Sequence, residues 1–265
     1  MKSIKVTQEV SFETLYESAK EDRYTLSIIM PCHNSGSYIG TMLFSLASQK
    51  FDGGVEIIFV LDDCSDDTLD RIKSDFIDKV GDRYAITVLS MNSKGFVSVA
   101  REVGRSVKRG DYEWHIDSDD YLIRPDAIYE ICNILRVHEP PLLHLRYHSD
   151  IDGWLEDNYG SPGSFDTTLW SNVYKTALSD KQSFGIAFVG EDSDFFGEFV
   201  KSNEIDTSDV LCTLDYYYYY TQLRSSSVSA LWWLQGAKRR GLTSRLADYY
   251  AYLEGKEWLK SYGGK

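Results

Sequence analysis

The 265-residue chain carries 28 Lys and Arg residues against 41 Asp and Glu residues, which gives a formal net charge of −13. A surface this acidic argues against nonspecific binding of nucleic acids or anionic membranes by the whole protein. The charge is uneven, because residues 224–265 hold eight basic and three acidic residues, a local charge of +5 that leaves −18 for the first 223 residues. Only this basic tail favours an anionic partner.

The composition, 43% hydrophobic and 26% charged, is that of a globular protein with one large or two small domains. The cysteines show no paired spacing, so we expect free thiols in a reducing compartment: Cys32, Cys64, Cys132 and Cys212. No secretory signal pattern opens the sequence, and no apolar run approaches the roughly 20 residues of a membrane span. These features predict a cytoplasmic protein.

Residues 1–22 are polar, and we expect an appended arm with a short helix from Ser11. Beyond this arm, apolar runs of strand length alternate with segments whose apolar residues recur at helical spacing. The expected strands cover residues 25–30, 55–61 and 84–89 and a fourth strand that includes Asp117; the expected helices lie near residues 38–47, 69–80 and 96–107. This alternation predicts an α/β fold with a parallel sheet covered by helices on both faces.

Polar side chains follow three of the expected strands, at residues 33–34, 62–63 and 117–120. In sheets of this class, ligands bind beyond the C-terminal ends of the strands, so these polar ends should converge on one site. Asp117, Asp119 and Asp120 would crowd negative charge there, and a divalent cation such as Mg2+ or Mn2+ would neutralise it with oxygen ligands. A solvated acidic turn is the alternative for an Asp-x-Asp motif taken alone.

Two common nucleotide-binding patterns are missing from the sequence. No Gly-x-Gly-x-x-Gly follows the first expected strand, and no Gly-Lys-Ser/Thr phosphate loop occurs anywhere. The Gly-rich, Arg-containing loop of the sugar-phosphate nucleotidylyltransferases is also missing after that strand. Dinucleotide-dependent enzymes, P-loop NTPases and nucleotidylyltransferases are therefore disfavoured.

Three segments in order, residues 26–34, 56–67 and 116–120, resemble the family 2 glycosyltransferases of the GT-A fold. The resemblance covers roughly residues 24–230. Residues 169–175 resemble that family's tryptophan-lysine segment, and residues 190–196 resemble its Glu-Asp motif. Residues 216–229 resemble its tyrosine-rich strand and closing loop. Two departures stand out: Cys64 replaces a usual Gly, and Arg101-Glu102 replaces an Arg-Asn pair. The resemblance implies a Rossmann-like mixed sheet flanked by helices, and we expect a C-terminal helical tail.

The resemblance also assigns a donor site. The residues that it places around the nucleotide sugar are Pro31, His33, Asn34, Asp62, Asp63, Lys94, Arg101, Asp117, Asp119 and Arg224. Asp63 would accept a hydrogen bond from the base; uracil and thymine offer a ring N–H, so UDP- or TDP-sugars suit the site. Asp119 and Asp120 would ligate Mn2+ or Mg2+, with Asp117 supporting or sharing ligation. Arg224 and the serines after it would form a loop that closes over the donor.

Asp192 is the expected general base and Glu191 a structural or acceptor-positioning residue; the same two carboxylates are also an ordinary acidic helix start. Trp170 and Lys175 are expected on the acceptor side. Trp154 and the tyrosines at 217–220 would stack on a sugar or simply pack. In the arrangement that the family resemblance implies, one base and no covalent nucleophile indicate a single displacement that inverts the anomeric centre.

We expect four parts: an N-terminal arm at 1–22, a nucleotide-sugar half at 23–122, an acceptor and catalytic-base half at 123–230, and a basic helical tail at 231–265. The tail would pack on the catalytic domain, form a homodimer or contact an anionic acceptor. The predicted activity is metal-dependent sugar transfer to a hydroxyl of a glycan or lipid-linked glycan. The alternatives are a modified DNA base as acceptor, and a catalytically silent nucleotide-sugar-binding protein.

Overall fold

The structure is a computed structural model that describes residues 2–5, 9–18, 21–51, 53–92, 94–149, 167–185 and 191–221. The chain divides into two compact units, one formed by residues 1–147 and 156–219 and the other by residues 148–155 and 220–265. Nearly all described residues belong to the first unit. The expected basic tail, Trp154, and Arg224 with its serine loop lie outside the described residues.

The described strands are β1 (Lys2–Lys5), β2 (Glu9–Glu17), β3 (Tyr24–Cys32), β4 (Val55–Asp62), β5 (Ala85–Met91), β6 (Gly110–His115), β7 (Tyr121–Leu122), β8 (Leu142–Ser149), β9 (Asn172–Lys175) and β10 (Val210–Tyr220). The described α-helices are α1 (Gly40–Ala47), α2 (Thr68–Arg71), α3 (Asp78–Val80), α4 (Val97–Arg105), α5 (Ala127–His138), α6 (Thr176–Ser179) and α7 (Glu191–Ser202). A π-helical segment, η1 (Ile72–Ile77), joins α2 to α3, and 3-10 turns lie at η2 (Gly81–Arg83), η3 (Leu169–Ser171) and η4 (Thr207–Asp209). Within these ranges, no helix has the length and apolar character that crossing a bilayer requires.

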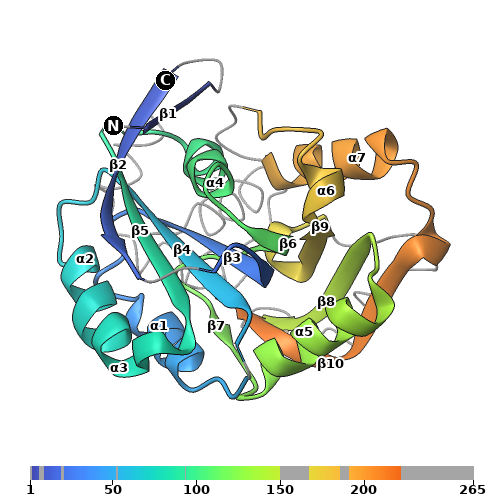
Figure 1. Ribbon diagram of the computed structural model, residues 1–265, viewed down its shortest axis with the longest axis horizontal. Helices are drawn as coiled ribbons and strands as arrows, with labels where there is room; N and C mark the ends of the chain where they lie inside the picture. Colours follow the sequence, from blue (N-terminus) through green and yellow to red (C-terminus); the bar gives the residue numbers. More distant parts are fainter. Residues whose placement is uncertain are drawn as a thin grey trace, which may run out of the picture. The chain divides into compact units, whose positions relative to one another are not determined.

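The described strands form one mixed sheet in the order β1-β2-β5-β4-β3-β6-β9-β8-β10-β7 (Figure 1). The central strands β5, β4, β3 and β6 are parallel, whereas β2 pairs antiparallel with β5, and β9 pairs antiparallel with both β6 and β8. The parallel sheet predicted from the strand–helix alternation therefore holds for the four central strands. The mixed sheet implied by the family resemblance is confirmed.

Side chains that alternate along β4 reach opposite faces of the sheet. Ile58 and Val60 pack in one cluster with α4, whereas the ring of Phe59 lies 5.8 Å from Phe76 of η1 on the other face. Helix α4 approaches β3 closely at Gly104, where an added Cβ would lie 2.5 Å from the Ile29 side chain. Helices therefore cover both faces of the parallel strands, as predicted.

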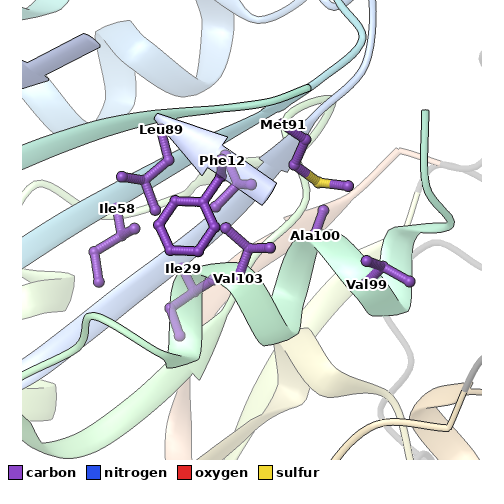
Figure 2. Close-up of a cluster of buried hydrophobic side chains, with 9 residues drawn as sticks. Phe12, Ile29, Ile58, Leu89, Met91, Val99, Ala100 and Val103 are labelled. Atoms are coloured by element: carbon purple, nitrogen blue, oxygen red, sulfur yellow. The ribbon is translucent and has the colours of Figure 1, made fainter. Parts of the chain in front are cut away.

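The helix expected from Ser11 is wrong, because residues 9–17 form strand β2, which lies between β1 and β5 in the sheet. Phe12 pairs with Met91 of β5 and is only 2% exposed, in the cluster that joins β2 to α4 (Figure 2). The alternation of apolar and polar residues in Val10-Ser11-Phe12-Glu13 is a strand pattern. Pairing with β5 also satisfies backbone groups that an isolated short helix would leave in water.

Replacing Phe12 with Ala tests whether β2 belongs to the domain. Phe12→Ala is expected to lower the free energy of unfolding by about 3 kcal/mol, because it opens a cavity beside α4. Leu15→Ala on the same strand is the control: Leu15 is 38% exposed, so the loss should stay below about 1 kcal/mol. Urea denaturation measures both, and equal small losses would mean that β2 is dispensable.

A second apolar cluster fixes α7 against the antiparallel part of the sheet. Phe195, Phe196 and Phe199 of α7 are buried together with Tyr174 of β9 and Leu142 of β8. The ring of Tyr174 lies edge-on to Phe195 and Phe199, at centroid distances of 5.4 and 5.0 Å. This packing sets the position of the first turn of α7, which carries the Glu-Asp pair.

Candidate active site

The C-terminal ends of β3 and β4 are joined by hydrogen bonds just beyond the sheet. The Nδ1–H of His33 donates to the main-chain oxygen of Asp62 at 2.5 Å, which assigns the proton to Nδ1. The side-chain oxygen of Asn34 accepts the backbone N–H of Ser65 at 2.8 Å. The structure thus brings together the polar residues that were predicted to follow these two strands.

Asp62 and Asp63 occupy different surroundings although they are neighbours. The Asp62 carboxylate is buried and accepts the backbone N–H of Gly95 at 2.7 Å; burial raises its pKa. Asp63 is exposed and has a φ of 50°, a left-handed backbone that is uncommon outside glycine and that often marks functional sites. Lys94, next to Gly95, is exposed near Asp62. These positions suit contacts with a bound nucleotide.

The aspartate turn, residues 117–120, follows β6. The expected fourth strand ends at His115, so Asp117 and Asp119 lie in a turn, closed by the backbone N–H of Asp120 donating to the Asp117 carbonyl at 3.4 Å. The carboxylates of Asp117, Asp119 and Asp120 each offer an oxygen within 4.8 Å of the others. Three converging carboxylates are a donor set that fits a hard divalent cation such as Mn2+ or Mg2+.

The three carboxylates differ in exposure. Asp117 and Asp119 are half-buried, whereas the Asp120 side chain has no exposed surface and accepts the hydroxyl of Tyr218 at 2.6 Å. Ser118, in the same turn, shares a hydrogen bond of 2.9 Å with Ser35 of the loop after β3. The turn is therefore connected both to the loop after β3 and to β10.

Arg101 of α4 links the aspartate turn to the start of α7. Its Nη2 donates to Asp117 at 2.9 Å and its Nη1 donates to Glu191, and the arginine is only 4% exposed. Burial lowers the pKa of Arg101, but Asp117 and Glu191 outweigh that effect and raise it. The predicted contact of Arg101 with the nucleotide stays a prediction; in the structure its guanidinium binds two carboxylates.

Glu191 and Asp192 stand in the first turn of α7 and have different partners. Glu191 pairs with Arg101, whereas Asp192 accepts the backbone N–H of Ser193 at 2.8 Å. Burial raises the pKa of both carboxyl groups; Arg101 offsets part of this rise for each, and the charge of Asp117 adds to it for Asp192. A half-buried carboxylate with a raised pKa is suited to accept a proton.

The two residues predicted to bind the acceptor lie in different places. Trp170 is buried and stacks on Tyr218 at a centroid distance of 6.4 Å, so it adjoins the support of the aspartate turn. Lys175 pairs in register with Tyr112, near the end of β6 that is remote from Asp117, and its Nζ lies 3.7 Å from Glu139. The structure therefore does not bring Lys175 to the carboxylates.

Sequence reasoning missed one residue that contacts the site directly. Tyr218 belongs to a run of tyrosines for which stacking and packing were the alternatives, and its hydroxyl instead contacts both ends of the aspartate turn. The available signal was the run of tyrosines on an expected strand, because a tyrosine hydroxyl that becomes buried there requires a polar partner.

Comparison with known proteins identifies relatives that this chain matches over only part of their length. Poly(ribitol-phosphate) beta-N-acetylglucosaminyltransferase TarS of Staphylococcus aureus is 26% identical over 178 residues, 67% of this chain and 30% of that protein. A glycosyltransferase of Haemophilus influenzae, described as uncharacterized, is 29% identical over 129 residues, 48% of this chain and 49% of that protein. The chain thus spans less than half the length of each of these relatives.

Two solved structures share the fold. Residues 1–349 of S. aureus TarS in complex with UDP-GlcNAc align with a TM-score of 0.64 and 20% identity, over 90% of this chain and 73% of that chain. The mannosyltransferase PcManGT of Pyrobaculum calidifontis in complex with GDP-Man and Mn2+ aligns with a TM-score of 0.64 and 13% identity, over 87% and 70%. The family model described as Glycosyl transferase family 2 matches residues 27–192, more than half of the chain. The chain therefore belongs to glycosyl transferase family 2 and has the GT-A fold.

Proposed function

We propose that the protein is a metal-dependent, inverting glycosyltransferase that moves a sugar from a UDP- or TDP-linked donor to a hydroxyl of a glycan or lipid-linked glycan. The observation that carries this proposal is the ion pairing of Arg101, which joins the aspartate turn to the Glu191-Asp192 pair. The guanidinium thereby binds Asp117 of the proposed cation site and Glu191, the neighbour of the proposed base Asp192.

The nucleotide would bind beyond β3 and β4. Pro31, His33 and Asn34 would contact the base from the end of β3, and Asp62 and Asp63 from the end of β4. The exposed Asp63 would accept the ring N–H of uracil or thymine. TarS structures that contain UDP and UDP-GlcNAc support a uridine nucleotide. Lys94 would approach the phosphates, and Arg224 would close over them.

Asp119 and Asp120 would hold Mn2+ or Mg2+, with Asp117 sharing or supporting ligation. When bound, the cation neutralises the negative charge that develops on the departing nucleoside diphosphate. The Mn2+ in the complex of PcManGT supports manganese as one competent metal. The three carboxylates supply only part of the coordination sphere, so phosphate oxygens and water would complete it.

Asp192 would act as the general base. The acceptor oxygen forms a bond to the anomeric carbon as the bond from that carbon to the diphosphate oxygen breaks, and Asp192 receives the hydroxyl proton. Because the hydroxyl attacks from the face opposite the leaving group, a single displacement inverts the anomeric centre. Glu191 would act indirectly, through Arg101, by fixing the first turn of α7.

The acceptor is proposed from the relatives and from charge. The name of TarS includes poly(ribitol-phosphate), which is an anionic polymer. A basic stretch within residues 224–265 would suit an anionic glycan or a lipid-linked phosphate. Four further expectations stay predictions: a modified DNA base as the acceptor, a catalytically silent binding protein, a homodimer formed through the tail, and a cytoplasmic location.

Calorimetric titration of UDP in the presence and absence of Mn2+ tests the donor site. We expect wild-type protein to bind UDP more tightly with Mn2+, and Asp119→Asn to weaken that binding at least ~10-fold, because a ligand carboxylate is lost. Asp70→Asn, at an exposed position on α2, should leave it unchanged. Equal UDP affinity with and without Mn2+ in wild-type protein would contradict the metal assignment.

A further inference from the structure

The hydroxyl of Tyr218 connects the two ends of the aspartate turn. It donates to the carboxylate of Asp120 at 2.6 Å and accepts the backbone N–H of Asp117 at 3.1 Å. Tyr218 lies on β10, about a hundred residues away along the chain, and it is completely buried. One phenol oxygen thus fixes both the first and the last of the three carboxylate-bearing residues.

The ring of Tyr218 is itself fixed by two tryptophans. Trp114 of β6 lies edge-on to it, with a centroid distance of 6.0 Å and an interplanar angle of 61°. Trp170 of η3 stacks on it at 6.4 Å and 28°. The indole N–H of Trp114 donates to the main-chain oxygen of Trp170 at 2.7 Å, which joins the two tryptophans. Because the ring cannot swing away without disturbing this packing, the hydroxyl position is set by the core.

The hydroxyl of Tyr218 also provides the Asp120 carboxylate with a hydrogen-bond donor inside the protein. The phenol O–H donates a hydrogen bond to the Asp120 carboxylate, and both groups are completely buried. A buried carboxylate is costly without such a donor. The hydrogen bond therefore offsets part of the cost of burying the Asp120 carboxylate, and it restricts the orientation of that carboxylate beside Asp117 and Asp119.

We propose that Tyr218 is a positioning residue of the divalent-metal site, which orients the aspartate turn through Asp120 and the backbone of Asp117 and so sets its affinity for the cation. This inference rests on the proposed function, because it takes the aspartate turn as the metal site. Partners that hydrogen-bond to metal-ligating side chains commonly change metal affinity 10- to 100-fold when they are removed.

A matched control lies next to Tyr218 in the chain. Tyr217 is 3% exposed, and its hydroxyl also donates to a carboxylate at 2.6 Å, but that carboxylate belongs to Glu130 of α5, away from the aspartate turn. Tyr217→Phe and Tyr218→Phe therefore remove similar hydrogen bonds from the same strand. Only the second touches the carboxylates that are proposed to hold the metal.

The test is a titration of Mn2+ binding in the presence of UDP, in which electron paramagnetic resonance measures the free ion. We expect Tyr218→Phe to raise the dissociation constant for Mn2+ by ~10-fold or more, and Tyr217→Phe to change it by less than about twofold. Circular dichroism should show both variants folded, because phenylalanine retains the ring between the tryptophans. In an Asp120→Asn background, the loss caused by Tyr218→Phe should shrink, since Tyr218 acts partly through that carboxylate.

Each other outcome overturns the inference. Mn2+ affinity that is unchanged in Tyr218→Phe, or weakened equally in both variants, would mean that Tyr218 only fills the core. A Tyr218→Phe protein that failed to fold would contradict it too, because loss of affinity without loss of fold is expected. If wild-type protein bound no Mn2+, the proposed metal site itself would be wrong, a result distinct from the failure of Tyr218 alone.

Discussion

Asp192→Asn is expected to reduce turnover by ~100-fold or more while donor affinity and metal dependence stay close to wild type. Asparagine preserves the shape of the side chain, but it cannot accept the proton of the attacking hydroxyl. The interaction that is lost is made in the transition state and not with the nucleotide. Steady-state kinetics with varied donor, combined with calorimetry of UDP, separates the two effects.

Glu191→Gln is the control for this assignment. Glu191 binds Arg101, so its replacement should lower stability more than Asp192→Asn does and turnover less. Full activity in Asp192→Asn together with an inactive Glu191→Gln would mean that the base is Glu191. Equal and full activity in both would exclude a base in this turn of α7.

The raised pKa of Asp192 adds a pH signature to the same prediction. Burial raises the pKa of this carboxyl above its usual value, so the base becomes protonated and turnover falls at a higher pH than an exposed aspartate would give. The activity is fully present above the raised pKa and is lost as the pH falls through it. Asp192→Asn should remove this acidic limb from its residual turnover.

Arg101→Met is expected to lower the free energy of unfolding by about 3 kcal/mol, because removing one partner of a buried ion pair leaves charges without compensation. Asp117 and Glu191 both lose their guanidinium partner, and Glu191 is only 11% exposed. Turnover should fall as well, since the aspartate turn and α7 lose the residue that connects them. Urea denaturation and donor kinetics measure the two losses.

Arg71→Met is the matched control for the arginine. Arg71 pairs with Asp67 and Asp75 on the surface of the α2–η1 segment, where water solvates all three groups, so stability should stay nearly unchanged. Glu191→Gln combined with Arg101→Met should recover part of the lost stability, because it removes one uncompensated carboxylate. An unfolding free energy that is unchanged in Arg101→Met would show that the buried ion pair contributes nothing.

Much of the sheet is predictable from local pattern. The apolar runs at 25–30, 55–61 and 84–89 became β3, β4 and β5 because strands buried on both faces require nearly continuous apolar residues. Strand β2 was missed because only one of its faces is buried. Polar residues therefore flank Phe12 in the sequence, and the segment resembles a solvated arm. The antiparallel pairing of β9 with β6 and β8 was not predicted, because the order of strands and helices along the sequence does not determine the direction in which neighbouring strands pair.

The candidate site divides in the same way. The aspartates of residues 117–120 are adjacent in the sequence, so their clustering could be predicted without knowledge of the fold. The contacts of Arg101 with Glu191 and of Tyr218 with Asp120 join residues about 90 and 98 positions apart. The spacing of apolar residues in the sequence cannot predict such contacts, because they arise only when α4, α7 and β10 pack around β6. The family resemblance supplied the Glu-Asp pair but not what fixes it.

A mass-spectrometric screen of nucleotide sugars for release of free nucleoside diphosphate, with and without Mn2+, tests the proposed activity most directly. We expect a UDP- or TDP-linked sugar to release its diphosphate in the presence of Mn2+, and this release to be abolished by EDTA and by Asp119→Asn. Release that persists undiminished in EDTA would contradict metal dependence. A folded protein that released no diphosphate from any nucleotide sugar, with acceptor glycans and Mn2+ or Mg2+ supplied, would contradict the proposed transferase.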